Sequence, residues 1–370
     1  YAFKAGFILS SRLLARVLGE RQTVGIDIGH YSVKMVRMLH THKGEHIVLS
    51  ADLEPLSEGI VVDCSIQDAE KLQEVISKLF ARSMIEEGVA EYIASINGAS
   101  GVLVDLMSAK VPKNANEDAF LLQMVQTKPP FDDPDNVLDY QVLSRNSDEV
   151  NIAAVAVKNA QLEDWAAFFT RVDKKLSAVD VSTFALANAY TATVEAEDHD
   201  KSVIVFNIGE KKMDAVYLMN GNFNSYRTMT SGALDSVISM LCKHLNIDAE
   251  KCHTIFETGD TSCVDGFSEA EVEEALKISY EEIVSAIEFG IRYFSSLDNA
   301  ENPEKILLGG GGACLPNLTS YLSERLGLSV ETVNPFRNVV CDSSVVGDKG
   351  MSLALSNIYA PALGLAMRKF

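Results

Sequence analysis

The sequence predicts an α/β fold of two related halves, each built on a sheet, with a ligand between them. Residues 24–29 (VGIDIG) and 203–209 (VIVFNIG) repeat one pattern about 180 residues apart: an apolar strand, a polar residue, a small residue, a tight turn and a second strand. A third segment, residues 306–313 (ILLGGGGA), is an apolar strand that runs into four glycines. Strand-like and helix-like segments alternate in both halves, which is the pattern of α/β proteins.

The glycines of these segments indicate an anion site. A Gly-containing turn follows the second strand of each repeat, at residues 43–44 and 220–221, and Asn-Gly between strand-like runs is a hairpin signal. Glycine turns expose backbone N–H groups, which suits phosphate. One Asp-x-Gly turn alone is usually structural. Its repetition, together with a costly run of four glycines at the end of a strand, favours a nucleotide between the halves.

The first half begins with strand-forming residues over 23–62. Apolar residues at helical spacing, among them Leu72, Ile76 and Leu79, then predict a helix over 66–87. Further strands are expected at 92–95, 103–107, 138–143, 150–157 and 178–181, and further helices at 116–127, 161–173 and 184–194. Asn97-Gly98 separates the first two of these strands, and Pro129-Pro130 ends the helix at 116–127.

A charged break at residues 195–201 is the best linker candidate, and the pattern restarts after it. Three strands are expected over 203–228 and one at 305–308. Helices are expected at 234–245, 269–297, 315–326 and 353–367, of which the second is long, acidic and amphipathic.

Composition places the chain among ordinary globular proteins. Its 370 residues, 47% of them hydrophobic, are enough for two core-bearing domains. The net charge of −20 excludes general attraction to nucleic acid or anionic lipid. The six cysteines lack C-x-x-C spacing and His neighbours, so we expect free thiols in a reducing cytosol, without zinc or disulfides.

Residues 1–22 differ from the rest of the chain. They carry four basic residues against one acid, and their apolar residues recur at mostly helical spacing. The segment is therefore expected to be an amphipathic helix. Two placements stay open: on a membrane or partner surface, or packed on its own domain.

At these motifs the chain resembles the actin-like ATPase superfamily, whose two ribonuclease-H-like halves enclose a nucleotide. Residues 27–29 (DIG) match the first phosphate loop, residues 207–209 (NIG) the second, and residues 308–313 the adenosine motif. The resemblance implies a duplicated, ribonuclease-H-like two-domain α/β fold.

Within that superfamily the chain is similar to the PilM family of type IV pilus assembly proteins, over roughly residues 23–370. The segments that carry the similarity are 24–36, 138–143, 181–190, 309–322 and 361–366. The resemblance implies an inserted 1C-type subdomain at 97–159. It also implies a subdomain 1A from 23–96, 160–199 and 351–370, a subdomain 2A from 200–245 and 303–350, and a subdomain 2B at 246–302.

The family resemblance implies a cytoplasmic scaffold, peripheral to the inner membrane, that binds ATP and Mg²⁺. Such proteins capture a short N-terminal peptide of a PilN-like inner-membrane protein in a groove between subdomains 1A and 1C. Other pilus platform proteins and further copies of the chain, in a ring or filament, are additional expected partners. Membrane contact would be indirect or through residues 1–22, and no nucleic acid partner is expected.

The first loop of the expected site centres on Asp27, which would sit beside Mg²⁺ or its water shell. The turn backbone from Gly29 and the Ser32 hydroxyl would hold the β- and γ-phosphates. Lys34 could point toward the site or away from it, and a surface position is favoured. His30 and Tyr31 stand where the family has small hydroxyl residues, and they are bulky for a phosphate loop.

Asn207 matters most in the second loop, because the superfamily normally has Asp there to place the metal and the attacking water. An amide keeps an oxygen acceptor but loses the charge, so ATP binding is expected with weak or no hydrolysis. Ser231-Gly232 precedes the helix at 234 and would lend its N-terminus to phosphate, act as its N-cap, or both. The remaining nucleotide-binding candidates are Gly209, Gly309, Gly310, Gly311 and Gly312.

Three alternatives share this fold. An FtsA-like division protein that polymerises on membrane usually has a C-terminal amphipathic anchor, whereas residues 368–370 directly follow the last predicted helix. A GspL-like type II secretion component would have a transmembrane helix after this domain. A small-molecule kinase would need a catalytic carboxylate near the second loop, where Asn207 stands.

Overall fold

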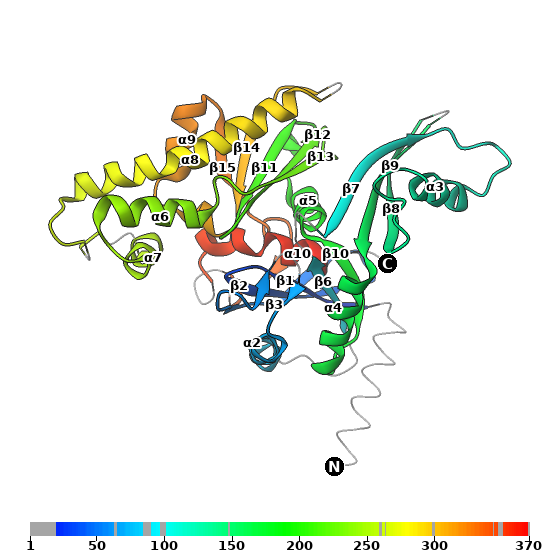
Figure 1. The fold of residues 1–370 in the computed structure, drawn as a ribbon, viewed down its shortest axis with the longest axis horizontal. Coiled ribbons are helices and arrows are strands. Elements are labelled where there is room, and N and C mark those ends of the chain that lie inside the picture. The colour runs from blue at the N-terminus through cyan, green and yellow to red at the C-terminus, as the bar shows by residue number, and fades with distance from the viewer. Residues whose placement is uncertain are drawn as a thin grey trace, which may run out of the picture.

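Two sheets of the same topology form the halves of the protein in this computed structural model (Figure 1). The structure describes residues 20–62, 65–83, 90–96, 101–146, 149–258, 261–262, 264–297, 300–342, 344–346 and 351–368. The first sheet has the order β10-β6-β1-β2-β3-β16 and the second the order β13-β12-β11-β14-β15. In each sheet three consecutive antiparallel strands are joined by two parallel ones, so the predicted duplication is confirmed.

The strands of the first sheet are β1 (Arg21–Ile28), β2 (Ser32–His40), β3 (His46–Pro55), β6 (Ala90–Ile96), β10 (Leu176–Val181) and β16 (Val340–Cys341). Those of the second sheet are β11 (Val203–Ile208), β12 (Met213–Met219), β13 (Asn222–Met229), β14 (Lys305–Gly309) and β15 (Ser329–Thr332). A short hairpin pairs β4 (Val61–Val62) with β5 (Ser65–Ile66).

Helices cover the outer faces of both sheets. The first sheet packs against α2 (Ala69–Arg82) and α4 (Asn159–Arg171), whose apolar faces include Leu72 and Trp165. The second packs against α6 (Leu234–Leu245), α8 (Glu269–Ser295) and α9 (Leu318–Leu326), with α7 (Ala249–Thr258) beside α6. The amphipathic faces of these helices are buried on the sheets, which is what stabilises helices of this length.

Two helices, α5 (Ser182–Thr193) and α10 (Ala360–Ala366), lie between the sheets (Figure 1). Glycines allow the close approach that this layer needs. A Cβ atom on Gly25 of β1 would lie 2.0 Å from the Ala362 carbonyl oxygen, and one on Gly364 would lie 1.7 Å from the Ala185 carbonyl oxygen. One buried cluster therefore joins β2, β11, β12, α5 and α10 into a core shared by both halves.

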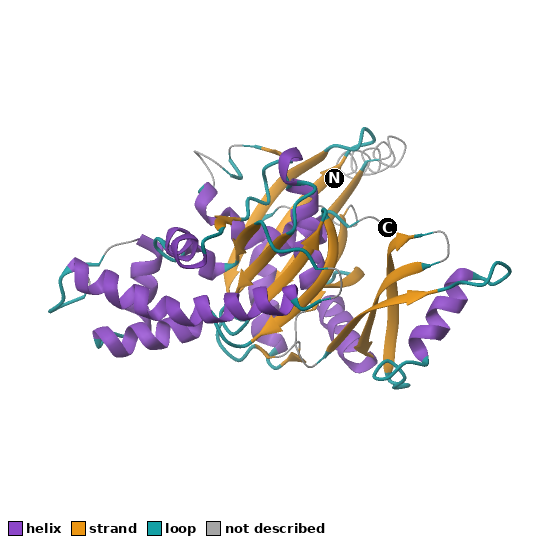
Figure 2. Cartoon of the chain, turned by 90° about the horizontal axis from the view of Figure 1, so that it is seen from above, coloured by secondary structure: helices purple, strands orange, loops and turns teal. Residues whose placement is uncertain are grey.

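A third, smaller sheet projects to one side of the first half (Figures 1 and 2). It has the order β7-β9-β8, with β7 (Val102–Ala109), β8 (Asn136–Arg145) and β9 (Val150–Lys158), and α3 (Glu117–Gln126) packs on it. Its core is separate from the others and includes Met107, Leu121, Phe131 and Ile152. The sheet falls within the segment predicted as an inserted subdomain, whose boundaries, like those of the other subdomains, stay a prediction.

Several predicted boundaries are wrong. The helix expected at 66–87 is α2, which begins after an Asp68 cap, and Ile66 belongs to β5. The last helix divides into a 3₁₀ segment, η3 (Leu353–Tyr359), and α10, because Pro361 favours the first turn of a new helix over the interior of one. Similarly, a 3₁₀ segment, η2 (Gly311–Cys314), precedes α9. Helix α7 and strands β15 and β16 were not predicted.

The predicted N-terminal helix cannot extend to residue 22, since Arg21 and Gln22 lie in β1. Residues 1–19 and the Asn97-Gly98 turn lie outside the described residues. The charged break at 195–201 contains a 3₁₀ turn, η1 (Ala196–Asp198). Among the helices that the structure describes, none combines the length and the apolar character needed to cross a bilayer.

Candidate functional site

The two predicted phosphate turns have the same backbone geometry. The Gly29 amide donates to the Ser32 carbonyl oxygen at 3.1 Å, and the Gly209 amide donates to the Lys212 carbonyl oxygen at 2.9 Å. Each turn joins two antiparallel strands, β1 to β2 and β11 to β12. The sequence repeat is therefore a structural repeat, down to one matching hydrogen bond.

Asp27 is buried at the end of β1, with 5% of its surface exposed. The Ser95 hydroxyl donates to its Oδ1 at 2.9 Å, and the Lys34 Nζ lies 3.5 Å from its Oδ2. Asp27 and Lys34 are register partners across the hairpin, so their side chains share a face of the sheet. That face is the one on which Gly25 meets α10, which places both groups toward the gap between the sheets.

Lys34 is the first correction to the predicted site. The surface position favoured from the sequence is wrong, because the Lys34 side chain is 17% exposed and pairs with Asp27. A Cβ atom on Gly29 would lie only 3.0 Å from the Lys34 Nζ. The ammonium therefore lies against the first turn, where a phosphate would bring negative charge.

Asn207 occupies the corresponding place at the end of β11. It shares a face with Val203 and Val205, which belong to the core between the sheets. Its Oδ1 atom is buried and has no hydrogen-bond partner among the described residues. An unpaired buried acceptor is costly and indicates a missing donor, such as a ligand or ordered water.

Sequence reasoning missed two further groups beside the second turn, Asp214 and Lys212. Asp214 is the register partner of Asn207 and is 2% exposed. The Thr228 hydroxyl donates to its Oδ1 at 2.6 Å, and the Lys212 Nζ lies 3.8 Å from its Oδ2. The sequence contains a signal for Asp214, because this residue comes seven residues after Asn207, just as Lys34 comes seven residues after Asp27.

Three of the four glycines at 309–312 divide into two kinds. A Cβ atom on Gly310 would lie 2.5 Å from the Ile208 carbonyl oxygen, and one on Gly312 would lie 2.2 Å from the Ile208 Cγ2. Both are therefore required by the close packing of this turn on β11. Gly311 is exposed, and the nearest atom to its Cβ would be 3.8 Å away. The protein's own packing leaves room at Gly311, as a ligand-approach role requires.

Ser231 and Gly232 precede α6 without capping it. The N-cap of α6 is Ala233, so the expected Ser231-Gly232 cap is wrong. The first two amides of the helix, Leu234 and Asp235, donate to the backbone carbonyls of residues 209 and 210, each at 3.0 Å. Those amides hold the second phosphate turn in place and are not free for a phosphate.

Contacts across the gap connect the first turn to the second half. The exposed Tyr31 ring stacks on His253 of α7, with ring centroids 5.5 Å apart. The Lys211 ammonium in the second turn lies 3.0 Å from a carboxylate oxygen of Glu58. The bulk of Tyr31 is thus directed outward onto α7. In the same region, burial raises the pKa of Glu210, and the charge of His253 acts in the opposite direction.

The residues present fit a nucleotide with a hard metal ion. Mg²⁺ in phosphate sites is held by one or two carboxylates, waters and the phosphates themselves, and Asp27 supplies such a carboxylate. An all-protein cage is not expected, and the described residues contain no group of three His, Cys or acidic side chains suited to a metal. The unpaired Asn207 oxygen offers an additional hydrogen-bond acceptor, and the backbone at Gly311 leaves space for a ligand.

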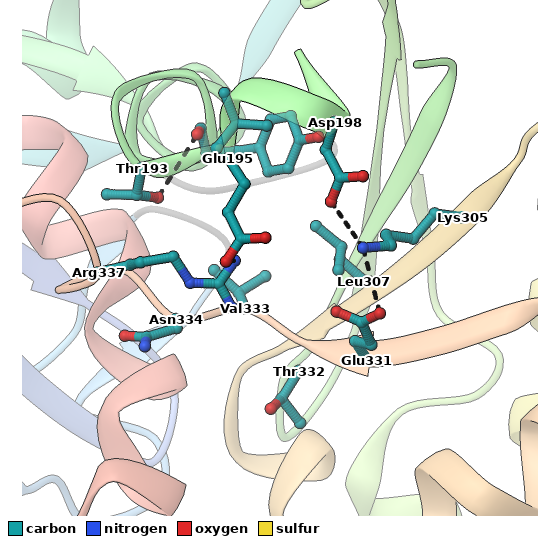
Figure 3. Close-up of a pocket in the computed structure, with 12 residues that line it drawn as sticks. Thr193, Glu195, Asp198, Lys305, Leu307, Glu331, Thr332, Val333, Asn334 and Arg337 are labelled. Carbon is teal, nitrogen blue, oxygen red and sulfur yellow. Dashed lines mark hydrogen bonds and ion pairs between the residues drawn. The ribbon is translucent and has the colours of Figure 1, made fainter. Parts of the chain in front are cut away.

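A separate cavity lies where α5, the 195–201 link, β14 and β15 meet (Figure 3). The charged side chains that line it pair with one another or with the neighbouring Lys201. Asp198 accepts from Lys201 at 2.6 Å and from Lys305 at 2.7 Å, and hydrogen bonds from these two lysines hold the pKa of Asp198 below its usual range. Arg337 pairs with Glu195 at 2.9 Å. This network ties the link between the halves to the second sheet.

The comparisons with known proteins agree with this architecture. A family model described as type IV pilus assembly protein PilM matches residues 25–370. The chain belongs to this family. The PilM match begins inside β1 and includes both phosphate turns, the three-stranded sheet and the glycine run. The resemblance predicted from the sequence is confirmed, and the FtsA-like and GspL-like alternatives are not favoured.

Solved structures show the same fold at low sequence identity. One, described as a PilM-PilN type IV pilus biogenesis complex, is 19% identical with a TM-score of 0.76, over 93% of this chain and 97% of that chain. The ethanolamine utilization protein EutJ from Carboxydothermus hydrogenoformans is 14% identical with a TM-score of 0.54, over 94% and 89%. MreB 5 of Spiroplasma citri, bound to AMPPNP, is 11% identical with a TM-score of 0.52, over 93% and 94%. The predicted actin-like fold is thereby confirmed.

Proposed function

We propose that the chain is a nucleotide-binding scaffold of the type IV pilus assembly platform, working on the cytoplasmic side of the inner membrane. The observation that carries the nucleotide part is the pair of matching turns, with Asp27 at the end of one strand and Asn207 at the end of the other. Both face the gap between the sheets. Membership of the PilM family supports the pilus assembly role.

ATP with Mg²⁺ is the proposed ligand, and weak or absent hydrolysis is the proposed outcome. Asp27 and Lys34 would meet the metal and the phosphates, and the open backbone at Gly311 would face the nucleoside. Asn207 has no charge with which to activate an attacking water. Calorimetric titration with Mg-ATP, with phosphate release followed in parallel, tests this proposal. Binding without release supports it, whereas no binding leaves a nucleotide-independent adaptor.

The proposed partner is an N-terminal peptide of a PilN-like membrane protein. Support comes from a groove between α3 and β8, lined by Asp118, Leu122, Leu138, Asp139, Tyr140, Gln141 and Val142. This groove lies within the 97–159 segment and not at the expected junction between subdomains 1A and 1C. Strand β8 is at the edge of its sheet, so its outer backbone groups are available to an extended peptide. The lining combines apolar side chains, Leu122, Leu138 and Val142, with two acidic ones, Asp118 and Asp139.

The chemistry of the groove suits a peptide with apolar side chains and a basic residue. Leu122 is 39% exposed and lines the groove, so its side chain is accessible to an apolar side chain of a peptide. Asp118 accepts a hydrogen bond from the Tyr140 hydroxyl at 2.6 Å, and this bond raises the pKa of Tyr140 to about 12. The carboxylate is thus held at the groove with its charge available to a cation.

A synthetic peptide with the N-terminal sequence of the PilN-like protein from the same cell tests this part. We expect Leu122→Lys to abolish peptide binding in fluorescence anisotropy, because it places a charge among the apolar side chains of the groove. Phe267→Lys changes an exposed aromatic residue far along the chain, between α7 and α8, and is expected to leave binding unchanged. Equal binding by both variants would move the peptide site away from this groove.

A further inference from the structure

Helices α6 and α7 lie beside each other at one end of the second half and bring two thiols together (Figure 1). The Cys242 Sγ on α6 and the Cys252 Sγ on α7 are 3.4 Å apart, and both residues are in the thiol form. Cys252 is fully buried in the core of the second half, whereas Cys242 packs against the same core and is half-buried. Neither thiol belongs to the nucleotide site or to the peptide groove described above.

We propose that Cys242 and Cys252 are a redox-active pair, which a hydroperoxide closes into a reversible disulfide that fixes α7 on α6. The sulfurs of a disulfide are about 2.05 Å apart, so closure from 3.4 Å needs an approach of about 1.4 Å. Side-chain rotation and a small shift of the short helix α7 can share this movement. Disulfides in reducing compartments are usually transient and redox-sensing, which is the behaviour proposed for this pair.

The unequal exposure of the two sulfurs assigns them different steps. The accessible Cys242 sulfur attacks one peroxide oxygen, the O–O bond breaks, and a Cys242 sulfenic acid forms while water or an alcohol leaves. The Cys252 sulfur, already beside it, then attacks the Cys242 sulfur. The S–S bond forms, the S–O bond breaks and a water leaves. In total the two thiols give two protons and two electrons to the peroxide.

Two other described thiols are less suited to this reaction. Burial raises the pKa of Cys314 and of Cys341, so a smaller fraction of either is present as the reactive thiolate. Cys314 accepts a hydrogen bond from the Asn357 Nδ2 at 3.5 Å. Cys341 is half-buried, as Cys242 is, but it lies in β16 of the first sheet. It is therefore a matched control for Cys242.

Helix α7 is the element that the cross-link would affect. It has ten residues, packs beside α6, and carries His253, which directly follows Cys252 and stacks on Tyr31 of the first turn. A disulfide across the short 246–248 connection would prevent the two helices from separating, so local openings that expose α7 would become rarer. Oxidation of a core thiol pair would thereby stabilise the helix that contacts the first turn.

Peptide mapping of the full chain tests the cross-link. After treatment with hydrogen peroxide and alkylation, we expect the peptides containing Cys242 and Cys252 to be joined by a bond that dithiothreitol cleaves. Cys242→Ser should abolish the joined peptides, whereas Cys341→Ser and Cys263→Ser should leave them unchanged; residue 263 lies outside the described residues. Peptides that join Cys252 to Cys263, or oxidation of Cys242 beyond sulfenic acid without a cross-link, would overturn the proposal.

Hydrogen exchange tests the effect on α7 and needs no variant. Amides of residues 249–258 should exchange about tenfold more slowly in the oxidised wild-type chain than in the reduced one. Helix α3, which packs on the separate three-stranded sheet, should exchange equally in both forms. Dithiothreitol should restore the faster exchange of α7. Equal exchange of α7 in a chain shown to hold the disulfide would overturn the proposed coupling between the thiol pair and this helix.

Discussion

The Tyr31 ring stacks on the His253 ring at 5.5 Å between centroids and 20° between planes, joining the first phosphate turn to helix α7 of the second half. His253 also packs edge-on against Phe256 of the same helix. We expect this stack, together with the ion pair between Lys211 and Glu58, to act as a latch that slows the exit of a nucleotide bound between the sheets.

Tyr31→Ala removes the latch and should speed nucleotide release. An aromatic pair contributes about 0.5–1.5 kcal/mol beyond its buried area, so release of a fluorescent ATP analogue should quicken about threefold to tenfold in stopped-flow measurements. His253→Ala should reproduce the effect, and Tyr31→Phe should retain wild-type release. Unchanged release in both alanine variants would show that the stack does not control exit.

Gly312→Ala should lower the stability of the fold, whereas Gly311→Ala should lower the affinity for ATP. A methyl group at 312 collides with Ile208, and overpacking of this kind costs about 1–3 kcal/mol of unfolding free energy. A methyl group at 311 meets only ordinary contacts, so stability should change by less than about 0.5 kcal/mol while ATP affinity falls. Chemical denaturation and calorimetry measure the two effects. Normal ATP affinity in Gly311→Ala would place the nucleoside elsewhere.

Asn207→Asp should convert a binding site into a hydrolytic one. The substitution adds a carboxylate beside the glycine turn, where the unpaired Asn207 oxygen now lies, and a positioned base contributes about 100-fold or more to such a reaction. Steady-state phosphate release from Mg-ATP measures the gain. ATP hydrolysis by the wild-type chain at an ordinary enzyme rate, with no faster hydrolysis in the variant, would contradict the proposal that the Asn207 amide limits hydrolysis.

Asp198→Asn should loosen the link between the halves in a pH-dependent way. Removing the Asp198 carboxylate takes a hydrogen bond from Lys305 and leaves it with Glu331, 3.1 Å away and half exposed, so the free energy of unfolding should fall by about 1–3 kcal/mol. Hydrogen bonds from the two lysines hold the pKa of Asp198 below its usual value. The stabilisation is therefore fully present above about pH 4 and disappears as the pH falls through the lower pKa of the folded state.

Unfolding free energies of the wild type and Asp198→Asn, measured from pH 7 down to pH 2, test that dependence. The difference should be largest at neutral pH and should shrink on acidification. Asp200→Asn is the matched control, since the side chain two residues along is 96% exposed. A difference that stays constant with pH would show that the variant acts through packing alone.

Much of the fold was predictable because its signals are local. Helix α6 begins and ends where the periodicity of residues 234–245 predicted, and α3 occupies the predicted segment behind an Asn116 cap. The duplication was visible because each turn needs its glycine. Helix α7 was missed because it is short and has little apolar character, so that packing beside α6 stabilises it more than its own sequence does.

The candidate site was predictable only in part. The turns at Gly29 and Gly209 follow from sequence, since a polar residue and a glycine after an apolar strand form a local pattern. The directions of Lys34, Lys212 and Asp214 do not, because the face of a strand on which a side chain lies depends on register and on what covers the sheet. For the same reason the sequence could not show which glycines of the run are required by packing on β11 and which one has free space beside it.

By itself, the sequence determined the repeat, the order of strands and helices, and the family, because all of these reside in patterns of neighbouring residues. Only the tertiary structure decided that Asp27 and Asn207 both face the gap between the sheets and that Tyr31 meets His253. These relationships join residues about 180 or more positions apart. They depend on how closely α10 packs on β1 at Gly25, which no local pattern specifies.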